Sequence, residues 1–372
     1  MTDARLQPLL DALATHGLDA AAFVPGPNFV SLFGRDFHLM ERPLVVVVAA
    51  SGEAVAIVPD LEMGSFAALD FPGEVIPWRD QDGYEHAFDA LADSLPALHN
   101  TDRLGIESQR MRAFEHMALQ RVYPQATLVD AHGAISSMRV RKTAEQIEHL
   151  REAIRRSEHA LEVVLRHVRA GMTEKMIESM LINALVEAGC DGLSFNPIVA
   201  AAGNAAEPHA HARDDYRIQA GDPLLIDFGG RYQGYNADIT RTFFVERASD
   251  EHRAIYNAVL NANLAGIAAA VPGATAHDID DAATASLEAT PYADLIVHKT
   301  GHGLGLDVHE APQIMRGNHH TLEPGTVFTV EPGLYRTNDV GVRIEDDVVI
   351  TASGCEVLTR FPKTLQIVGA PS

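Results

Sequence analysis

Acidic residues placed inside strongly apolar segments constrain this chain more than any other feature. They follow or precede runs such as Leu224–Ile226, Val327-Phe328 and Val348–Ile350, where an uncompensated carboxylate would be costly to bury. A histidine bracketed by glycines, in Gly301-His302-Gly303, lies between them in the sequence. The full set is Asp227, Asp238, His302, Glu331 and Glu345. Such residues need a partner of opposite charge, and a shared metal centre provides one.

The ligand types indicate which metals would bind. Carboxylate oxygens and one imidazole suit Mn, Zn, Co or Fe(II), with manganese our first choice, and do not form a thiolate-bound structural zinc site. Two adjacent divalent ions require several carboxylates, some of them bridging, and a hydroxide between the ions is then the expected nucleophile. The sequence therefore predicts two divalent metal ions per chain.

The spacing of the acids supports a shared site. Asp227 and Asp238 flank an expected hairpin that turns near residues 232–234, and an even-numbered loop would place them directly opposite each other, with Cβ atoms about 5 Å apart. Glu331 and Glu345 flank a second turn at Asn338, where an odd-numbered loop puts both on one face. Each acid alone could be a solvated strand end, and the Gly-His-Gly run could be a flexible loop. Two hairpins with opposed acids favour the metal site.

Length and charge narrow the class of protein. With 372 residues, 47% of them hydrophobic, the chain can form two domains, and we expect an α/β domain over residues 1–135 followed by a catalytic domain over 136–372. A net charge of −22 argues against nucleic acid or an anionic membrane as partner. Only two cysteines and no signal-peptide or membrane-spanning run predict a cytoplasmic protein.

Local patterns predict the order of elements. In the first domain we expect a helix over 5–15 and strands over 20–24, 43–49, 54–58 and near 128–129. In the second, Thr143 with Gln146 forms a capping box for one helix, and Thr173 caps another that ends at Gly189. Helices fall in two blocks, 143–188 and 250–289, and strands in two more, 194–246 and 294–360. The fold class is therefore α/β (α+β), with a hint of αβ duplication.

Four further residues are candidates for contact with a substrate. Taken alone, His209, His298 or His309 would more often be a surface histidine or one satisfied in the core, but beside two metal ions His209 and His309 become candidate catalytic groups. Arg343 shares a strand face with Glu345, so it could pair with a ligand carboxylate or with a substrate carboxylate.

The metal-ligand pattern, together with Gly301–Glu310 and Val330–Tyr335, resembles the pita-bread metallopeptidases. The closest branch is the proline-specific one, comprising Xaa-Pro aminopeptidase and Xaa-Pro dipeptidase (prolidase). The first domain resembles the creatinase-type N-terminal domain of that branch through Gly17–Ala20 and Pro25–Gly34. The resemblance thus implies a pita-bread catalytic domain preceded by a smaller creatinase-type domain. Creatinase lacks the five ligands, and methionine aminopeptidases usually lack an N-terminal domain of this size.

The resemblance also implies roles for individual residues. Asp238 and Glu345 would bridge the two ions, Asp227 would serve one ion, and His302 and Glu331 the other. His209 and His309 would contact the substrate and stabilise the tetrahedral intermediate, His298 would line the substrate pocket, and Glu331 would move a proton to the leaving nitrogen.

These roles predict an Xaa-Pro aminopeptidase that acts on proline-containing peptides. The alternative is an Xaa-Pro dipeptidase, in which Arg343 would bind the free proline carboxylate, and a more remote one is a non-catalytic metal-binding scaffold. The loop Gly34–His38 is expected to close the site of a neighbouring subunit, as in similar dimers, so a homodimer is expected.

Overall fold

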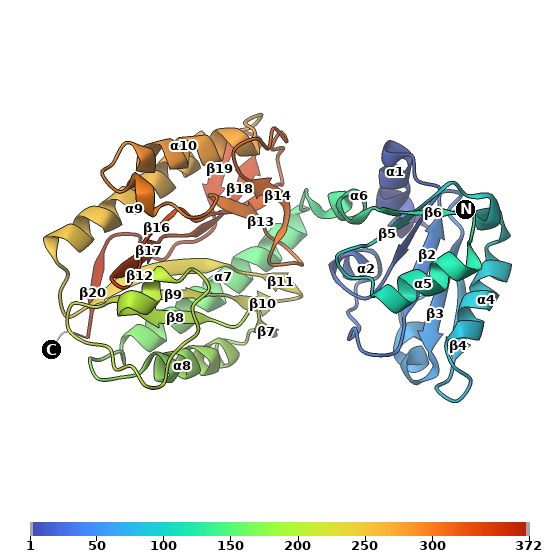
Figure 1. The fold of residues 1–372 in the computed structure, drawn as a ribbon, viewed down its shortest axis with the longest axis horizontal. Helices are drawn as coiled ribbons and strands as arrows, with labels where there is room; N and C mark the ends of the chain where they lie inside the picture. The colour runs from blue at the N-terminus through green and yellow to red at the C-terminus, as the bar shows by residue number, and fades with distance from the viewer. Residues whose placement is uncertain (1–2, 370–372) are drawn as a thin grey trace. The chain divides into compact units, whose positions relative to one another are not determined.

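The computed structural model describes residues 3–369 and divides the chain into two compact units, Met1–Arg139 and Val140–Ser372. The division falls inside the basic connection 135–142, four residues after the expected end of the first domain. Each unit has its own hydrophobic cores, and Figure 1 shows the chain coloured from end to end. No helix of residues 3–369 combines the length and the apolar character needed to cross a membrane.

The first unit is built on a six-stranded sheet with the order β4-β3-β2-β1-β5-β6. Strand β2 runs antiparallel to both of its neighbours, and the other pairs are parallel. The strands are β1 (Ala20–Phe23), β2 (Val45–Ala49), β3 (Ala54–Pro59), β4 (Glu74–Trp78), β5 (Arg103–Ile106) and β6 (Thr127–Asp130). All four expected strands are therefore confirmed, and the valine run of β2 is continuous because alternate residues enter separate cores on the two faces.

Helices cover both faces of this sheet. The helices α1 (Gln7–His16), α2 (Pro27–Phe33), α3 (Met63–Ala67) and α6 (His132–Ser136) contribute to one core, while α4 (Glu85–Ser94) and α5 (Ala113–Val122) contribute to the other. Helix α1 ends at Gly17, whose left-handed φ of 60° closes the last turn.

The loop Arg35–Arg42 contains no regular secondary structure, but it is anchored within its own unit. Phe37 is buried and packs against Phe29 and Phe66, with ring centroids 5.6 and 6.0 Å away. Leu39 and Met40 are exposed, at 41% and 58%. The loop is therefore anchored by Phe37 and by the ion pair of Arg42 with Asp80, while Leu39 and Met40 remain open to solvent.

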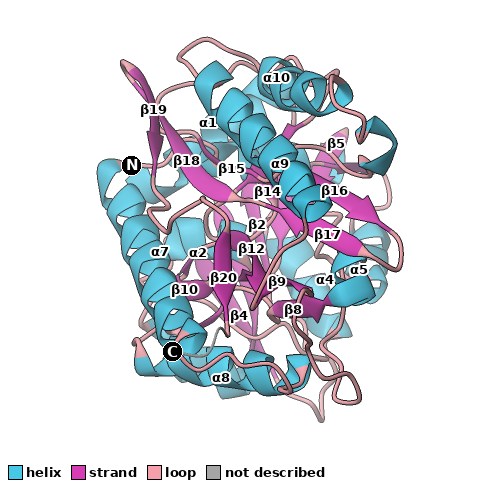
Figure 2. Cartoon of the chain, turned by 90° about the vertical axis from the view of Figure 1, so that its left-hand side faces the viewer, coloured by secondary structure: helices cyan, strands magenta, loops and turns pink. Residues whose placement is uncertain are grey.

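The second unit places its strands between two helix pairs, as Figures 1 and 2 show. The pairs are α7 (Ala144–Leu165) with α8 (Glu174–Glu187), and α9 (Asp250–Ala269) with α10 (Ala276–Glu288). Thr143 and Gln146 form the expected capping box, and the side chain of Thr173 caps α8. The two-block layout of helices and strands expected from the sequence is confirmed.

Two larger and two smaller sheets lie between these helices. The four-stranded sheet packs against α7 and α8 and has the order β20 (Gln366–Val368), β12 (Ile239–Val245), β9 (Pro223–Phe228), β8 (Ile198–Ala201). The five-stranded sheet packs against α10 and has the order β14 (Glu310–Ile314), β13 (Gly301–Gly303), β15 (Val327–Val330), β18 (Asp346–Thr351), β19 (Gly354–Val357). The smaller sheets are β7 (Gly192–Leu193) with β10 (Gly230–Tyr232) and β11 (Tyr235–Asn236), and β16 (Gly333–Arg336) with β17 (Val340–Arg343).

The first of the two expected hairpin registers is wrong. Asp227 lies opposite Thr240, and the turn falls on Gln233-Gly234, whose φ angles of 50° and 80° are both positive. A two-residue turn of this kind needs left-handed backbone at both positions, which moves the turn one residue along the chain. The partner of Asp227 is shifted by two residues, from Asp238 to Thr240, and a shift of two keeps side chains on the same face of the sheet. Asp227 and Asp238 therefore still share a face, but as diagonal neighbours.

The second register is confirmed. Gly333 pairs with Arg343 on one side of the acids, and Val330 pairs with Asp346 on the other. Both pairings continue a single register, which places Glu331 opposite Glu345. Asn338, at the centre of the odd-numbered loop, has a left-handed φ of 59°.

Candidate metal centre

The five expected ligands converge on one point of the second unit. Their ligand atoms form two groups, each with atoms within 4.8 Å of one another: Asp227 with Asp238 and Glu345, and His302 with Glu331 and Glu345. Asp227 is in β9 and Asp238 lies just before β12, whereas His302 is the middle residue of β13. Both glutamates lie where β15 and β17 pass into the strands that follow them. Residues from separate sheets therefore meet through the registers of two hairpins.

The carboxylates are buried, and not all of their oxygen atoms have a hydrogen-bond partner in the protein. Asp238 is 4% exposed and Glu345 is 1% exposed. The Oδ1 atom of Asp227 is buried and has no hydrogen-bond partner. A buried carboxylate oxygen with no donor is unfavourable unless something positively charged binds it.

His302 is held as a neutral imidazole that could bind a metal ion. Its Nδ1 donates to the carbonyl of Gly303 at 3.1 Å, which leaves the lone pair of Nε2 facing Glu331 Oε1 at 3.3 Å and Asp238 Oδ2 at 3.6 Å. Burial lowers the pKa of His302 to about 3, so the ring does not compete for the site as a cation.

The glycines beside His302 serve close packing and do not form a flexible loop. A Cβ at Gly301 would collide with the backbone of Thr329, and one at Gly303 with the backbone of Ala311. Strand β13 lies between β14 and β15, so His302 is fixed from both sides. The alternative of a flexible Gly-His-Gly loop is wrong.

A buried arginine organises the carboxylates on one side of the centre. Arg343 donates to Asp227 Oδ2 at 2.6 Å, to Thr240 Oγ1 at 3.0 Å and to the hydroxyl of Tyr335 at 2.7 Å. Thr240 in turn donates to Glu345 Oε2 at 2.6 Å. Of the two roles considered for Arg343, the structure shows pairing with the carboxylate of Asp227, one of the expected ligands, and the arginine side chain is 2% exposed.

Three of these supporting residues were not singled out from the sequence. Thr240 and Tyr335 belong to the network around Arg343, and Asp347 accepts the backbone N–H of Asp238 at 3.1 Å. Strand alternation offers a signal for two of them, since Thr240 is two residues from Asp238 and Asp347 is two from Glu345. Tyr335 carried no such signal, because its role depends on the pairing of β16 with β17.

The electrostatics are those of a cation site. Burial raises the pKa of Asp238, and the neighbouring Glu345 and Asp227 raise it further. Burial and the charge of Glu331 raise the pKa of Glu345 in the same way, and burial raises the pKa of Glu331 to about 7. Closely spaced acids of this kind are stable as carboxylates only when positive charge is supplied. Together with the unpartnered Asp227 oxygen and the neutral His302, they fit bound divalent metal.

The three histidines expected to contact the substrate differ in how closely the structure relates them to this centre. The ring of His309 lies 4.2 Å from that of His302, nearly perpendicular to it, and its side chain is exposed. One ring nitrogen of His309 lies within 4.8 Å of ligand atoms of Asp238 and His302, so geometry alone leaves open whether it binds metal. His298 is partly buried and accepts from the hydroxyl of Tyr335 at 2.8 Å, while His209 is exposed and close enough to influence the pKa of both other rings.

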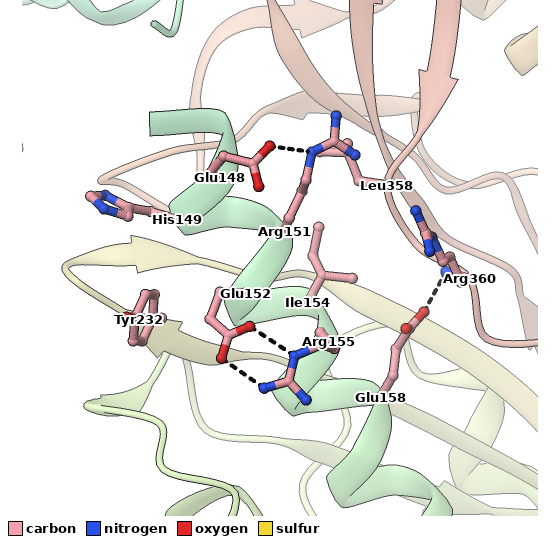
Figure 3. Close-up of a pocket in the computed structure, with 10 residues that line it drawn as sticks. All are labelled: Glu148, His149, Arg151, Glu152, Ile154, Arg155, Glu158, Tyr232, Leu358 and Arg360. Carbon is pink, nitrogen blue, oxygen red and sulfur yellow. Dashed lines mark hydrogen bonds and ion pairs between the residues drawn. The ribbon is translucent and has the colours of Figure 1, made fainter. Parts of the chain in front are cut away.

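A cavity of about 450 Å³ lies elsewhere in the second unit, along α7. Figure 3 shows its lining, in which charged side chains pair within the wall: Glu148 with Arg151, and Glu152 with Arg155. It contains none of the five ligands, so it does not define the chemistry of the site.

Comparison with known proteins agrees with this geometry. Residues 148–352 match metallopeptidase family M24, and residues 5–141 match the creatinase/prolidase N-terminal domain. The chain belongs to metallopeptidase family M24. The two matches confirm the resemblance and the pita-bread fold expected from the sequence, and the M24 match spans all five expected ligands.

Relatives and solved structures extend the match over nearly the whole chain. The uncharacterized peptidase YqhT of Bacillus subtilis is 35% identical over 321 residues, which cover 85% of this chain and 88% of that protein. The Xaa-Pro dipeptidase from Bacillus anthracis is 30% identical with a TM-score of 0.87, covering 98% of this chain and 99% of that one. The X-Pro aminopeptidase from Thermotoga maritima is 29% identical with a TM-score of 0.81, covering 97% and 98%. The protein is thus an M24 metallopeptidase of the prolidase and X-Pro peptidase type.

The raised carboxylate pKa values predict that metal stabilises the protein more as the pH rises. A folded-state pKa of about 7 for Glu331, against 4.5 as its ordinary value, means that the metal-free protein loses stability as the pH rises through this window. Bound cations balance the same charges, so the metal-loaded protein should not lose it. We expect the difference in Tm between Mn²⁺-loaded and EDTA-treated protein to widen from about pH 5 to pH 8. A constant or narrowing difference in thermal unfolding would contradict the electrostatics described above.

Proposed function

We propose that the protein is an Xaa-Pro aminopeptidase, which hydrolyses the bond between an N-terminal residue and a following proline. The observation that carries the proposal is the cluster of four carboxylates and one neutral histidine in an M24 domain. The similarity to solved Xaa-Pro peptidases supports proline as the second residue. A non-catalytic scaffold is disfavoured, because a scaffold has no need of His309 and His209 at the rim of the cluster.

Each ligand would have a distinct part in holding the metals. Asp238 and Glu345 would bridge two divalent ions, with Asp227 on one side and His302 and Glu331 on the other. The ions, when bound, would polarise the scissile carbonyl and lower the pKa of water, and manganese is our first choice among Mn, Zn, Co and Fe. Arg343 and Thr240 would keep Asp227 and Glu345 in orientation by the hydrogen bonds described above.

The remaining residues would act on the substrate. His309 and His209 would donate hydrogen bonds to the carbonyl oxygen as negative charge develops on it, a contribution of a few kcal/mol. Glu331 would pass a proton to the leaving nitrogen of proline. His298, which accepts from Tyr335, would line the pocket beside the substrate.

The second candidate is an Xaa-Pro dipeptidase, which must recognise a free proline carboxylate. Its support is the similarity to the Bacillus anthracis dipeptidase. Arg343 was the expected cation for that carboxylate, but its guanidinium is already bound to Asp227, Tyr335 and Thr240. In a dipeptidase, Arg343 would have to bind the substrate carboxylate with its remaining N–H groups, or another cation would take that part.

The deciding experiment compares substrates of different length. Purified, Mn²⁺-loaded protein is given Xaa-Pro dipeptides, Xaa-Pro-Yaa tripeptides and matched Xaa-Ala-Yaa peptides, and release of the first residue is measured. We expect cleavage of the tripeptide that is lost with EDTA and absent for the alanine peptides. Cleavage of the dipeptide alone would establish the dipeptidase. Absence of metal-dependent turnover on all proline peptides would favour the scaffold.

A further part of the proposal is a cytoplasmic homodimer in which the Arg35–Arg42 loop limits substrate length. Its exposed Leu39 and Met40 are unusual at a free loop tip, and a neighbouring subunit would cover them. Replacing Arg35, Asp36 and His38 by Gly and Ser, and keeping the buried Phe37, should change the ratio of dipeptide to longer-peptide cleavage without changing metal content. An unchanged ratio, or the mass of a single chain by light scattering, would contradict this proposal.

A further inference from the structure

A buried ion pair outside the ligand set joins Lys142 to Glu310. Their side chains are 2% and 3% exposed, and the ammonium contacts the carboxylate directly. The ammonium also donates to the carbonyl of Val140 at 3.4 Å. Two charges removed from water in this way depend on each other, because removing one leaves the other buried without compensation.

The lysine is held rigidly from the backbone side. Its N–H donates to Gly325 O at 2.8 Å, and the next residue, Thr143, caps helix α7. The charge therefore comes from a fixed point at the beginning of the second unit and not from a mobile surface chain.

The glutamate begins strand β14 and directly follows His309. The backbone that leads to it, residues 304–309, passes closely over the ion pair. A Cβ at Gly305 would lie 2.7 Å from Glu310 Oε1 and 2.9 Å from Lys142 Cε. The carbonyl of Gly305 also accepts both the backbone and the side-chain N–H groups of Asn236, each at 2.9 Å. The segment between His302 and Glu310 is thus held at Gly305, which packs against the ion pair and binds Asn236.

The ring of His309 has no comparable support of its own. Within residues 3–369 it makes a ring contact with His302, but no hydrogen bond holds it, and its side chain is exposed. Its position beside the metal ligands therefore depends on the backbone of residues 304–310. That backbone is anchored at the adjacent residue, Glu310.

We propose that Lys142 is a positioning residue, which through its ion pair with Glu310 fixes the backbone that presents His309 to the substrate. The kinetic part of this inference rests on the proposed function, in which His309 contacts the reacting carbonyl. Without the ammonium, the Glu310 carboxylate is left buried without its compensating charge and must move toward water. This movement is transmitted through one peptide unit to His309.

The position of His309 can be observed without activity. In metal-free protein labelled with ¹³C at histidine Cε1, the His309 resonance is identified by its absence from His309→Ala. We expect Lys142→Met, which keeps most of the side-chain volume, to shift or broaden this resonance while those of distant histidines such as His159 stay in place. The matched control is Lys175→Met, because Lys175 forms an ion pair with Glu178 but is 56% exposed. An unchanged His309 resonance in Lys142→Met would overturn the proposal.

Kinetics separate a positioning role from a general structural one. Lys142→Met should lower kcat about 10- to 100-fold with little change in KM or metal content, since small misplacements of a catalytic group act on turnover. In the His309→Ala background the same substitution should lower kcat by less than about twofold, because both changes remove one effect. Independent, multiplicative losses would overturn the proposal.

A second variant keeps the test decisive if Lys142→Met does not fold. Glu310→Gln preserves the shape of the side chain and breaks the ion pair by removing the negative charge. The double variant Lys142→Met/Glu310→Gln removes both charges, so it should restore stability while the His309 resonance stays displaced. If the wild-type protein cleaves no proline peptide, the proposed function fails. The resonance comparison still decides whether Lys142 positions His309.

Discussion

Asp238→Asn and Glu345→Gln are each expected to abolish tight binding of both metal ions and to lower kcat/KM on Xaa-Pro peptides by about 1,000-fold or more. Asp238 and Glu345 share one group of ligand atoms with Asp227, and Glu345 also belongs to the group of His302 and Glu331. Replacing a carboxylate that binds both ions removes a negatively charged ligand from each of them, so both ions should be lost. The amide variants keep the shape of the side chain, which limits the change to charge and ligand strength.

Elemental analysis after dialysis, with activity measured in parallel, checks this result. The matched control is Glu162→Gln, which makes the same chemical change at an exposed position of helix α7 and should retain both ions and full activity. Two tightly bound ions per chain in either ligand variant would contradict the bridging assignment. Loss of a single ion from Glu345→Gln would reduce Glu345 to a ligand of one ion.

His309→Ala is expected to keep both metal ions and lose about 100-fold or more in turnover, mainly in kcat. The ring lies against His302 but is exposed and makes no hydrogen bond in the described part of the chain. Its ring nitrogens are therefore available for a hydrogen bond to a substrate. The five expected ligands already supply four carboxylates and a neutral imidazole, so His309 is not needed to complete the set. Its loss should therefore weaken the transition state without emptying the site.

The alternative for His309 is a direct metal ligand, since its ring nitrogen lies within 4.8 Å of ligand atoms of Asp238 and His302. Metal content measured beside kcat distinguishes the two roles. If metal and activity fall in proportion in His309→Ala, then His309 is a ligand and our assignment is wrong. The control is His159→Ala on the exposed face of α7, which should change neither quantity.

The sequence alone determined to which protein family the chain belongs and where its local structural elements lie. Acids inside apolar strands, a glycine-bracketed histidine and capping residues such as Thr143 and Thr173 act through neighbours a few residues away, so their consequences can be predicted from spacing. The pairing of Glu331 with Glu345 belongs to this class, because an odd-numbered loop fixes which residues face each other. The same local reasoning paired Asp227 with Asp238, two residues from its observed partner Thr240, since the backbone angles of the Gln233-Gly234 turn decide the register.

Only the tertiary structure decided what supports the site. The engagement of Arg343 with Asp227 and Tyr335, the hold of Asp347 on the backbone of Asp238, and the pair of Lys142 with Glu310 each join residues at least eight positions apart, most of them more than 100. Hydrogen bonds and charge pairs of this kind depend on how separate sheets and loops pack, and desolvation makes them strong only once that packing exists. Spacing along the chain indicated that Arg343 could pair with a carboxylate of the site, but not that its partners are Asp227 and Tyr335, and it gave no sign of the pair of Lys142 with Glu310.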